Sequence, residues 1–293
     1  MDVNCEGCAG CCVDWRALTD LPDPEREVPR QPVDDAYNLV PLEIDEVRGL
    51  IDAGLGDVLT PRVFRVTDPD AEGTVEIDGE PLAAIRGRPA FYVGLCTPPK
   101  PVAPAGREDP RWLPTCVFLD PTTLQCRIHD GPLYPNACSA YPGANLSLDQ
   151  ETECERVERA GGGDRLLDAT PPSEVPGLRL GPQAVGAKLF AHPDPDDLGG
   201  RIERIADGRP TAEDRATFAA AAAASSPGTV SIDRRRFESV KRTVLDADSW
   251  GGQAIDEWTD VAGPIGTADG NCTPSLAKRF EDDHGAPGTP GWE

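Results

Sequence analysis

The stretch Cys5-Glu-Gly-Cys8-Ala-Gly-Cys11-Cys12 determines how the rest of the sequence is interpreted. It places four of the chain's ten cysteines in one short segment, with the spacing C-x2-C-x2-C-C. Two-residue gaps let successive thiolates face one centre, as in zinc knuckles and iron–sulfur loops. Glycine in the gaps supplies the positive φ angles that a loop wrapped around a metal needs. The stretch therefore predicts a thiolate metal centre rather than a set of packed or disulfide-bonded cysteines.

The first three cysteines repeat the C-x2-C-x2-C opening of the bacterial ferredoxin motif. The fourth departs from that motif, because Cys12 directly follows Cys11 instead of coming three residues later. Neighbouring side chains point in different directions on a helix or a strand. We therefore expect Cys11 and Cys12 not to serve one mononuclear site equally, so that one binds the first centre while the other reaches a second centre or packs.

A second group of cysteines lies between residues 115 and 142. Segments containing Cys116 and Cys126 flank the turn sequence Asp-Pro-Thr-Thr, which predicts a hairpin that brings the two thiols close together. Cys138 follows after a proline-containing segment. These thiols occur singly, whereas a zinc ribbon needs a second C-x2-C pair. The pattern favours a site to which the N-terminal loop supplies several ligands and distant segments supply the others.

Together these motifs resemble the YkgJ-type CxxCxxCC cysteine-cluster family, which is described as zinc- or iron-chelating. That family joins the N-terminal motif to a distal pattern, matched here by Cys116-Val-Phe-Leu-Asp120, Cys126-Arg-Ile128 and Cys138-Ser-Ala-Tyr141-Pro142. Two departures are His129, where the family has an aromatic residue, and Leu133-Tyr134-Pro135, where Arg-Pro is common. The resemblance covers about residues 1–160. A more distant similarity to flagellin lysine-N-methylases shares the cysteine pattern.

Eight cysteines are the predicted metal ligands. Seven belong to the two motifs, and the eighth lies in the sequence Thr-Glu-Cys-Glu-Arg; they are Cys5, Cys8, Cys11, Cys12, Cys116, Cys126, Cys138 and Cys154. His129 has ligand spacing from Cys126 and is a further candidate. Cys96 is interpreted as a small buried residue, and Cys272 as unrelated to the site.

The predicted fold class is α+β. A small metal-centred domain over residues 1–160, with short strands, a hairpin and a helix, precedes a Gly/Pro-rich linker at 161–186, a helical region at 187–278 and a mobile tail at 279–293. Within the first domain we expect a helix near 41–55, strands near 63–66, 74–77 and 90–93, and an exposed extended insertion at 97–114. In the helical region, Thr211 begins a capping pattern.

Composition indicates the environment of the protein. The formal net charge is -23, and only four residues are lysine. Such a surface stays soluble where salt screens its self-repulsion, so we expect a high-salt, halophilic cytoplasm. The charge disfavours binding to nucleic acid or to an anionic membrane. No segment resembles a membrane span or a signal peptide, and a reducing cytoplasm favours metal thiolates over disulfides.

The function predicted from these features is binding of a metal ion or an iron–sulfur cluster for a structural or redox role. Thiolates select soft metals, and the ferredoxin-like opening favours iron–sulfur over zinc. Seven or eight thiols could fill two four-ligand centres, or one centre with spare packing cysteines. The methylase resemblance implies a cluster-dependent, protein-modifying enzyme as an alternative, and metal storage or delivery is a second one. Neither the substrate nor the protein partner follows from the sequence.

Overall fold

The computed structural model describes residues 7–22, 30–68, 71–161, 170–175, 178–179, 181–263 and 273–290. The chain forms two compact units. Unit 1 comprises Met1–Glu25, Cys96–Leu178 and Ser249–Glu293, and unit 2 comprises Arg26–Leu95 and Arg179–Asp248. The units are interleaved along the chain, so their boundaries differ from the predicted ones near residues 160 and 187. The difference arises because the segment after the cysteine loop packs with helices from the second half of the chain.

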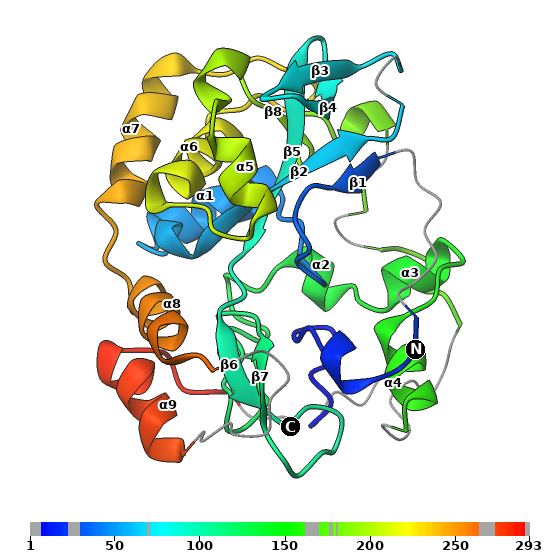
Figure 1. The fold of residues 1–293 in the computed structure, drawn as a ribbon, viewed down its shortest axis with the longest axis vertical. Coiled ribbons are helices and arrows are strands. Elements are labelled where there is room, and N and C mark those ends of the chain that lie inside the picture. The colour runs from blue at the N-terminus through cyan, green and yellow to red at the C-terminus, as the bar shows by residue number, and fades with distance from the viewer. Residues whose placement is uncertain are drawn as a thin grey trace. The chain divides into compact units, whose positions relative to one another are not determined.

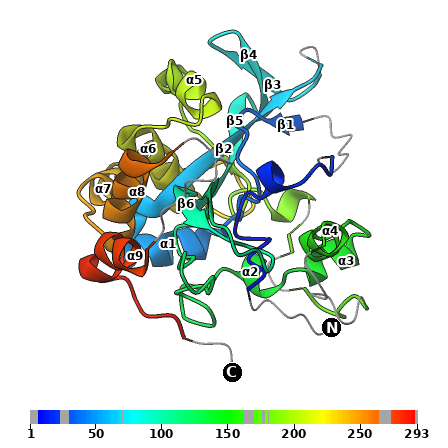
Figure 2. The ribbon, with the colours of Figure 1, turned by 60° about the horizontal axis from the view of Figure 1, so that its bottom comes forward.

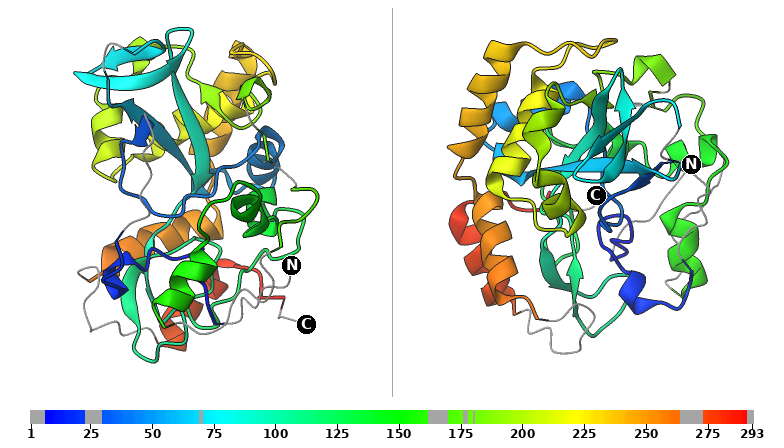
Figure 3. Two further views of the ribbon diagram at one scale, coloured as in Figure 1. Left: turned by 90° about the vertical axis from the view of Figure 1, so that its right-hand side faces the viewer. Right: turned by 45° about the horizontal axis from the view of Figure 1, so that its top comes forward.

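Unit 2 contains an antiparallel sheet, and the whole fold is α+β as predicted (Figure 1). In the described part of the chain the sheet has six strands: β1 (Arg30–Pro32), β2 (Leu59–Val66), β3 (Thr74–Ile77), β4 (Glu80–Ile85), β5 (Arg88–Leu95) and β8 (Phe190–Ala191). The central pair is β2 and β5, which runs in register from Leu59 opposite Leu95 to Val63 opposite Phe91. Figure 3 shows these two blue-to-cyan strands from two further directions.

Four α-helices accompany the sheet in the described residues of unit 2, together with short 3-10 turns at Gly56–Val58, Gly181–Gln183 and Pro195–Leu198. The helices are α1 (Ile44–Asp52), α5 (Arg201–Ala206), α6 (Ala212–Ala223) and α7 (Arg234–Leu245). Helix α6 packs against α1, α7 and β2 (Figure 2). The alanines of its second half are fully buried, and their small side chains allow this close approach on several sides. Phe218 of α6 lies edge-on to Phe91 of β5, with the ring centroids 4.8 Å apart.

The predicted capping pattern of α6 is confirmed. The Thr211 hydroxyl accepts a hydrogen bond from the Asp214 backbone, and the Asp214 carboxylate accepts one from the Thr211 backbone at 2.9 Å. The same buried carboxylate also binds the guanidinium groups of Arg201 at 2.8 Å and Arg204 at 2.7 Å. Burial opposes ionisation of Asp214, but the hydrogen bonds from Arg204, Thr211 and Arg201 outweigh it and hold its pKa well below the ordinary value. Asp214 thus ties α5 to the start of α6.

Unit 1 has a two-stranded sheet and short helices in its described residues. The strands are β6 (Pro99–Val102) and β7 (Arg111–Pro114), and the helices are α2 (Asn136–Ser139), α3 (Gly143–Ser147), α4 (Glu153–Arg159), α8 (Trp250–Val261) and α9 (Pro274–Phe280), with 3-10 turns at Arg16–Leu18 and Asp282–His284. The predicted exposed insertion at 97–114 is wrong. Residues 99–114 form the β6–β7 hairpin, whose Lys100, Val102, Trp112 and Leu113 are buried.

The C-terminal helices form an aromatic core. Trp112, Trp258 and Phe280 are buried together, and the Trp258 and Phe280 rings meet edge-on with centroids 4.9 Å apart. The predicted mobile tail from residue 279 is therefore wrong at its start, because Phe280 and Glu281 are buried at 3% and 0% exposure. The described helices are all too short or too polar to cross a lipid bilayer.

Replacing Asp214 by asparagine should lower the free energy of unfolding by about 3 kcal/mol at pH 7, since two arginines lose a buried carboxylate. A lowered pKa stabilises the fold fully above the ordinary value of 3.8, and this contribution is lost as the pH falls through the lowered pKa. Urea unfolding at pH 7 and pH 3 should therefore show a smaller difference between wild type and Asp214→Asn at pH 3.

Asp207→Asn is the matched control, because Asp207 is half-exposed and pairs with the exposed Arg209. It should change the free energy of unfolding by less than about 1 kcal/mol. Equal losses in the two variants would contradict the role assigned to Asp214.

Candidate functional site

The cysteine loop turns sharply in its described part. Gly7 and Ala9 both have positive φ angles, of 64° and 50°, and the Cys12 backbone donates to the Ala9 carbonyl at 2.9 Å. Gly10 is needed for space, since a Cβ atom there would lie 2.6 Å from the side chain of Val157 on α4. The loop therefore lies directly against α4. Gly10 allows this close approach, and Gly7 provides a positive φ angle.

Backbone hydrogen bonds join this loop to the second cysteine segment. Val13 and Thr115 form an antiparallel bridge, and the Cys116 backbone donates to the Cys12 carbonyl at 2.8 Å. On the other side of the bridge, the Asp14 backbone donates to the Pro114 carbonyl, also at 2.8 Å. These bonds bring Cys12 and Cys116 together, although they are far apart in the sequence.

The segment after Cys116 forms the predicted turn. Leu119 and Cys126 make an antiparallel bridge, and the Arg127 backbone donates to the Phe118 carbonyl at 2.8 Å. The carboxylate of Asp120 holds the turn by accepting hydrogen bonds from the Thr122 backbone and hydroxyl at 2.8 and 2.7 Å. The result is a tight turn with one bridge rather than a hairpin of two full strands.

Cys138 and Cys154 lie on short helices. Cys138 is on α2, where its backbone donates to the Pro135 carbonyl at 2.9 Å. Cys154 is buried in the first turn of α4, which begins with a capping box between Thr152 and Glu155. The Tyr141 hydroxyl accepts a hydrogen bond from the Glu153 backbone and so links the two helical segments.

Cys11 and Cys12 share a hydrogen bond, with their sulfur atoms 3.8 Å apart. Either thiol can be the donor of this bond, which lowers the pKa of Cys11 and raises the pKa of Cys12. Burial and the charges of Cys11, Cys116 and Cys138 raise the pKa of Cys12 further.

Cys116 and Cys126 belong to the same electrostatic neighbourhood. Burial raises the pKa of Cys126 to about 12, and the charges of Cys116 and Cys11 add to the effect. Burial also raises the pKa of Cys116, while a backbone hydrogen bond from Phe118 and the positive charge of Lys100 oppose the rise. The pKa values of Cys116 and Cys126 therefore depend on the charge of neighbouring thiols, and a nearby positive charge favours the thiolate form of each.

Five of the eight predicted ligands are linked through their electrostatic influence on one another or on Tyr134, and we call them the thiol cluster: Cys11, Cys12, Cys116, Cys126 and Cys138. Cys8 lies beside Gly10, and the charge of Cys154 acts on Tyr141, so both flank the cluster. Cys5 lies outside the described residues. Within the described ranges, no three or more His, Cys, Asp or Glu side chains are arranged as a group that could hold a metal ion.

Two tyrosines adjoin the thiol cluster. Burial raises the pKa of Tyr134, and the charges of Cys138, Cys126, Cys11 and Cys12 raise it further. Burial likewise raises the pKa of Tyr141. His129, the alternative ligand, stacks on Tyr134 with ring centroids 4.9 Å apart, and its Nδ1 lies 3.3 Å from the Asp130 carboxylate.

A buried carboxylate connects the second cysteine segment to the end of the chain. The Lys100 ammonium, fully buried, donates to the carbonyls of Val117 and Leu119 at 2.9 and 2.8 Å, and it lies 2.7 Å from the Glu281 carboxylate. Lys100 thereby holds both ends of the Val117–Leu119 segment, which directly follows Cys116. The ammonium uses the backbone oxygens and the carboxylate together, as a buried cation requires.

Arg127 completes this network. Its guanidinium donates to the Glu281 carboxylate at 2.9 Å and to the Pro287 carbonyl at 2.8 Å, and it lies 3.2 Å from the Asp120 carboxylate. The Trp258 indole donates to the other Glu281 oxygen at 2.9 Å. Arg127 directly follows Cys126 and binds Glu281 itself. Val117 directly follows Cys116 and is bound by Lys100, which pairs with the same Glu281 carboxylate.

Sequence reasoning missed Lys100 and Glu281. Lys100 is one of only four lysines in an arginine-rich chain, and its rarity was a signal that it has a specific place. Glu281 lies among other acidic residues, where nothing in the local pattern distinguishes a buried carboxylate from a solvated one. Only the tertiary structure separates it from its exposed neighbour Asp283.

One buried ion network thus supports two segments of unit 1, each of which directly follows a cysteine. The chain belongs to the family of unknown function DUF7531, which matches it over residues 1–293. No curated protein shows significant similarity to the chain. No solved structure matches it either.

Replacing Glu281 by alanine should lower the free energy of unfolding of unit 1 by about 3–5 kcal/mol, because two buried cations lose their shared partner. Urea unfolding followed by tryptophan fluorescence reports the loss, since the Trp258 indole hydrogen bonds to Glu281. Asp283→Ala is the control at an exposed carboxylate that pairs with Lys278, and it should cost less than about 1 kcal/mol. A loss of similar size in both variants would refute the role assigned to the buried Glu281 carboxylate.

Proposed function

We propose that the chain binds a metal ion or an iron–sulfur cluster through the thiol cluster, together with Cys5, Cys8 and Cys154, in a structural or redox role. The observation that carries the proposal is the backbone pairing that places Cys12 beside Cys116 from a distant segment, with the sulfur atoms of Cys11 and Cys12 3.8 Å apart. The charges of Cys116 and Cys138, which raise the pKa of Cys12, agree with this proximity. A bound cation or cluster supplies the positive charge that lets several of these thiols ionise together.

The donor set fits such a group. Thiolates are the ligands preferred by zinc and by iron–sulfur centres. The sulfur atoms of Cys11 and Cys12 are 3.8 Å apart. Two ligands of one tetrahedral thiolate site with bonds of about 2.3 Å have a similar separation, of roughly 3.8 Å. This separation supports binding of one ion by Cys11 and Cys12 together, in place of the division between two centres expected from the sequence. The number of thiols supports an iron–sulfur centre or a second site.

The surroundings of the thiols favour a firmly held group. The Lys100 ammonium lies near Cys116 and partly offsets the negative charge of the thiolates. Tyr134 and Tyr141 are held in their neutral form beside the cluster, so they add no further negative charge. When bound, a metal ion would crosslink the loop, the turn and α2, and an iron–sulfur cluster would also allow one-electron transfer.

Protein purified without oxygen should contain stoichiometric metal, and acid-labile sulfide if the centre is iron–sulfur. Cys116→Ser should lose most of both, because it removes a thiol from the middle of the cluster. Cys96→Ser is the matched control: Cys96 is also a buried cysteine of unit 1, and its carbonyl accepts from the Val117 backbone. Metal and sulfide analysis with visible absorption spectra makes the comparison. Equal contents in the two variants, or none in wild type, would overturn the proposal.

We also propose a reducing, salt-rich cytoplasm as the site of action. Cys11, Cys12, Cys116 and Cys126 are free thiols in the structure, which supports a compartment that keeps thiols reduced. The chain has 51 acidic residues against 28 lysines and arginines. At low salt the excess carboxylates repel one another and destabilise the folded state.

Raising KCl from about 0.1 M to about 2 M should therefore increase the melting temperature by about 5 °C, because the salt shortens the range of the repulsion. Calorimetry over a series of KCl concentrations measures the change. Sucrose is the control, since it stabilises by exclusion from the surface and leaves charges unscreened. A melting temperature that does not rise with KCl, or that rises no more than it does with sucrose, would contradict the salt-rich location.

A further inference from the structure

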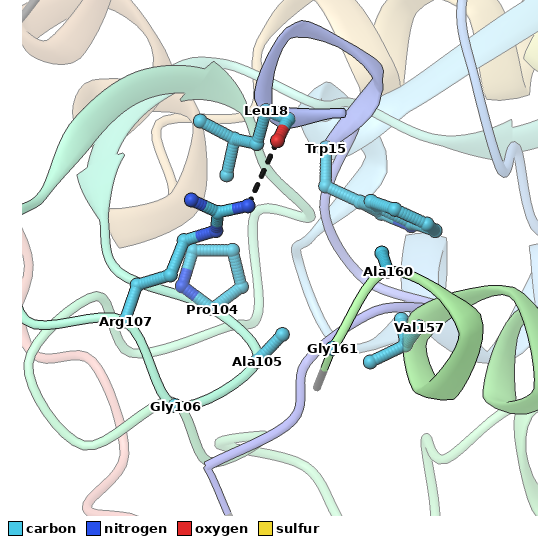
Figure 4. A pocket seen from close by; sticks show the side chains of 9 residues that line it. All are labelled: Trp15, Leu18, Pro104, Ala105, Gly106, Arg107, Val157, Ala160 and Gly161. Atoms are coloured by element: carbon cyan, nitrogen blue, oxygen red, sulfur yellow. Dashed lines mark hydrogen bonds between the residues drawn. The ribbon is translucent and has the colours of Figure 1, made fainter. Parts of the chain in front are cut away.

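Two adjoining hollows lie beside the cysteine loop in unit 1. The first has a volume of about 260 Å³, with Trp15, Pro104 and Val157 among its lining residues (Figure 4). The second has a volume of about 630 Å³ and opens more widely to solvent. Leu18, Arg107 and Ala160 line both hollows, so the two are continuous.

The second hollow is basic, in a chain that is strongly acidic. Among the described residues, Arg107, Arg111 and Arg159 line it together with one acidic residue, Asp20. The whole chain has 28 basic and 51 acidic residues, so a surface with three arginines and one aspartate is the reverse of its average. A concentration of positive charge against such an excess of negative charge requires a specific reason.

Two of these arginines keep their charge available. Arg107 donates to the carbonyl of Leu18 at 2.8 Å, which is a neutral acceptor (Figure 4). Neither Arg107 nor Arg111 forms an ion pair with any residue that the structure describes. Arg159 pairs with Glu151, which lies outside the lining of the hollow. The hollow therefore presents a net positive charge.

The walls of the hollows are held in place by hydrogen bonds. The Ala105 backbone donates to the Cys8 carbonyl at 2.9 Å, which fixes the loop that carries Arg107. The Trp15 indole donates to the buried Glu153 carboxylate at 3.0 Å, which fixes the wall on the side of α4. These two bonds hold the first hollow, and the bond from Arg107 to the Leu18 carbonyl joins two of the segments that line the second. Preformed walls lower the entropic cost of binding.

We propose that the second hollow binds a small, multiply charged oxyanion, of the phosphate or polycarboxylate type, through Arg107, Arg111 and Arg159. Guanidinium groups match such oxygens because they donate two parallel hydrogen bonds to one oxyanion. The size of the hollow is within the usual range for small-molecule sites. The net charge of -23 repels polyanionic macromolecules and anionic membranes, which leaves small anions as the fitting ligands. This proposal does not depend on metal binding by the thiol cluster.

The test is titration calorimetry with pyrophosphate and with citrate, at about 50 mM salt so that screening stays weak. Both Arg111→Gln and Arg159→Gln should weaken binding of the preferred anion at least about tenfold, the usual effect of losing a charge-assisted hydrogen bond. Arg209→Gln, at an exposed arginine of unit 2 paired with Asp207, should bind as wild type does. A preference for pyrophosphate or for citrate distinguishes the phosphate type from the polycarboxylate type.

Ala160→Glu provides a second variant that should fold normally, since Ala160 is exposed and follows the last residue of α4. It places a negative charge where the two hollows meet and should abolish binding of both anions without lowering the melting temperature. Metal content should be unchanged in Arg111→Gln, which separates this site from the thiol cluster. The proposal is overturned if wild type binds neither anion, or if Arg111→Gln and Ala160→Glu bind as tightly as Arg209→Gln.

Discussion

The structure of unit 1 depends on one buried carboxylate. Glu281 accepts hydrogen bonds from Arg127 and Trp258 and lies 2.7 Å from the Lys100 ammonium, with no exposure to solvent. An isolated buried charge would be very unfavourable, so each of the two cations requires this carboxylate. The end of the chain thereby becomes part of the fold around the second cysteine segment, although it lies more than a hundred residues further along the sequence.

This network supports both segments of the second cysteine motif. Backbone pairing places Cys116 next to Cys12, and the Asp120 turn places Cys126 opposite Leu119. The ion network then fixes the residues that follow Cys116 and Cys126. The backbone positions of Cys12, Cys116 and Cys126 are therefore set by main-chain hydrogen bonds and by buried charges on neighbouring residues.

The elements that sequence patterns predicted well are those with local signals. The helix α1 and the helices α6 to α8 carry apolar residues at helical spacing or clear capping residues, and the predicted strands near 63–66, 74–77 and 90–93 are present. Prolines made residues 97–114 look like an exposed insertion, yet Pro99 and Pro101 lie within β6. Proline is tolerated in this two-stranded hairpin because each strand has a free edge.

The sequence alone determined the α+β class, the grouping of cysteines into two motifs and the acidic surface, because periodicity, spacing and composition are local properties. It did not determine that residues 26–95 pack with residues 179–248, nor that Glu281 is buried while Asp283 stays exposed. Those features depend on contacts between distant segments. A side chain's burial and ionisation follow from the partners it meets, and only the tertiary structure brings Lys100, Arg127 and Glu281 into contact.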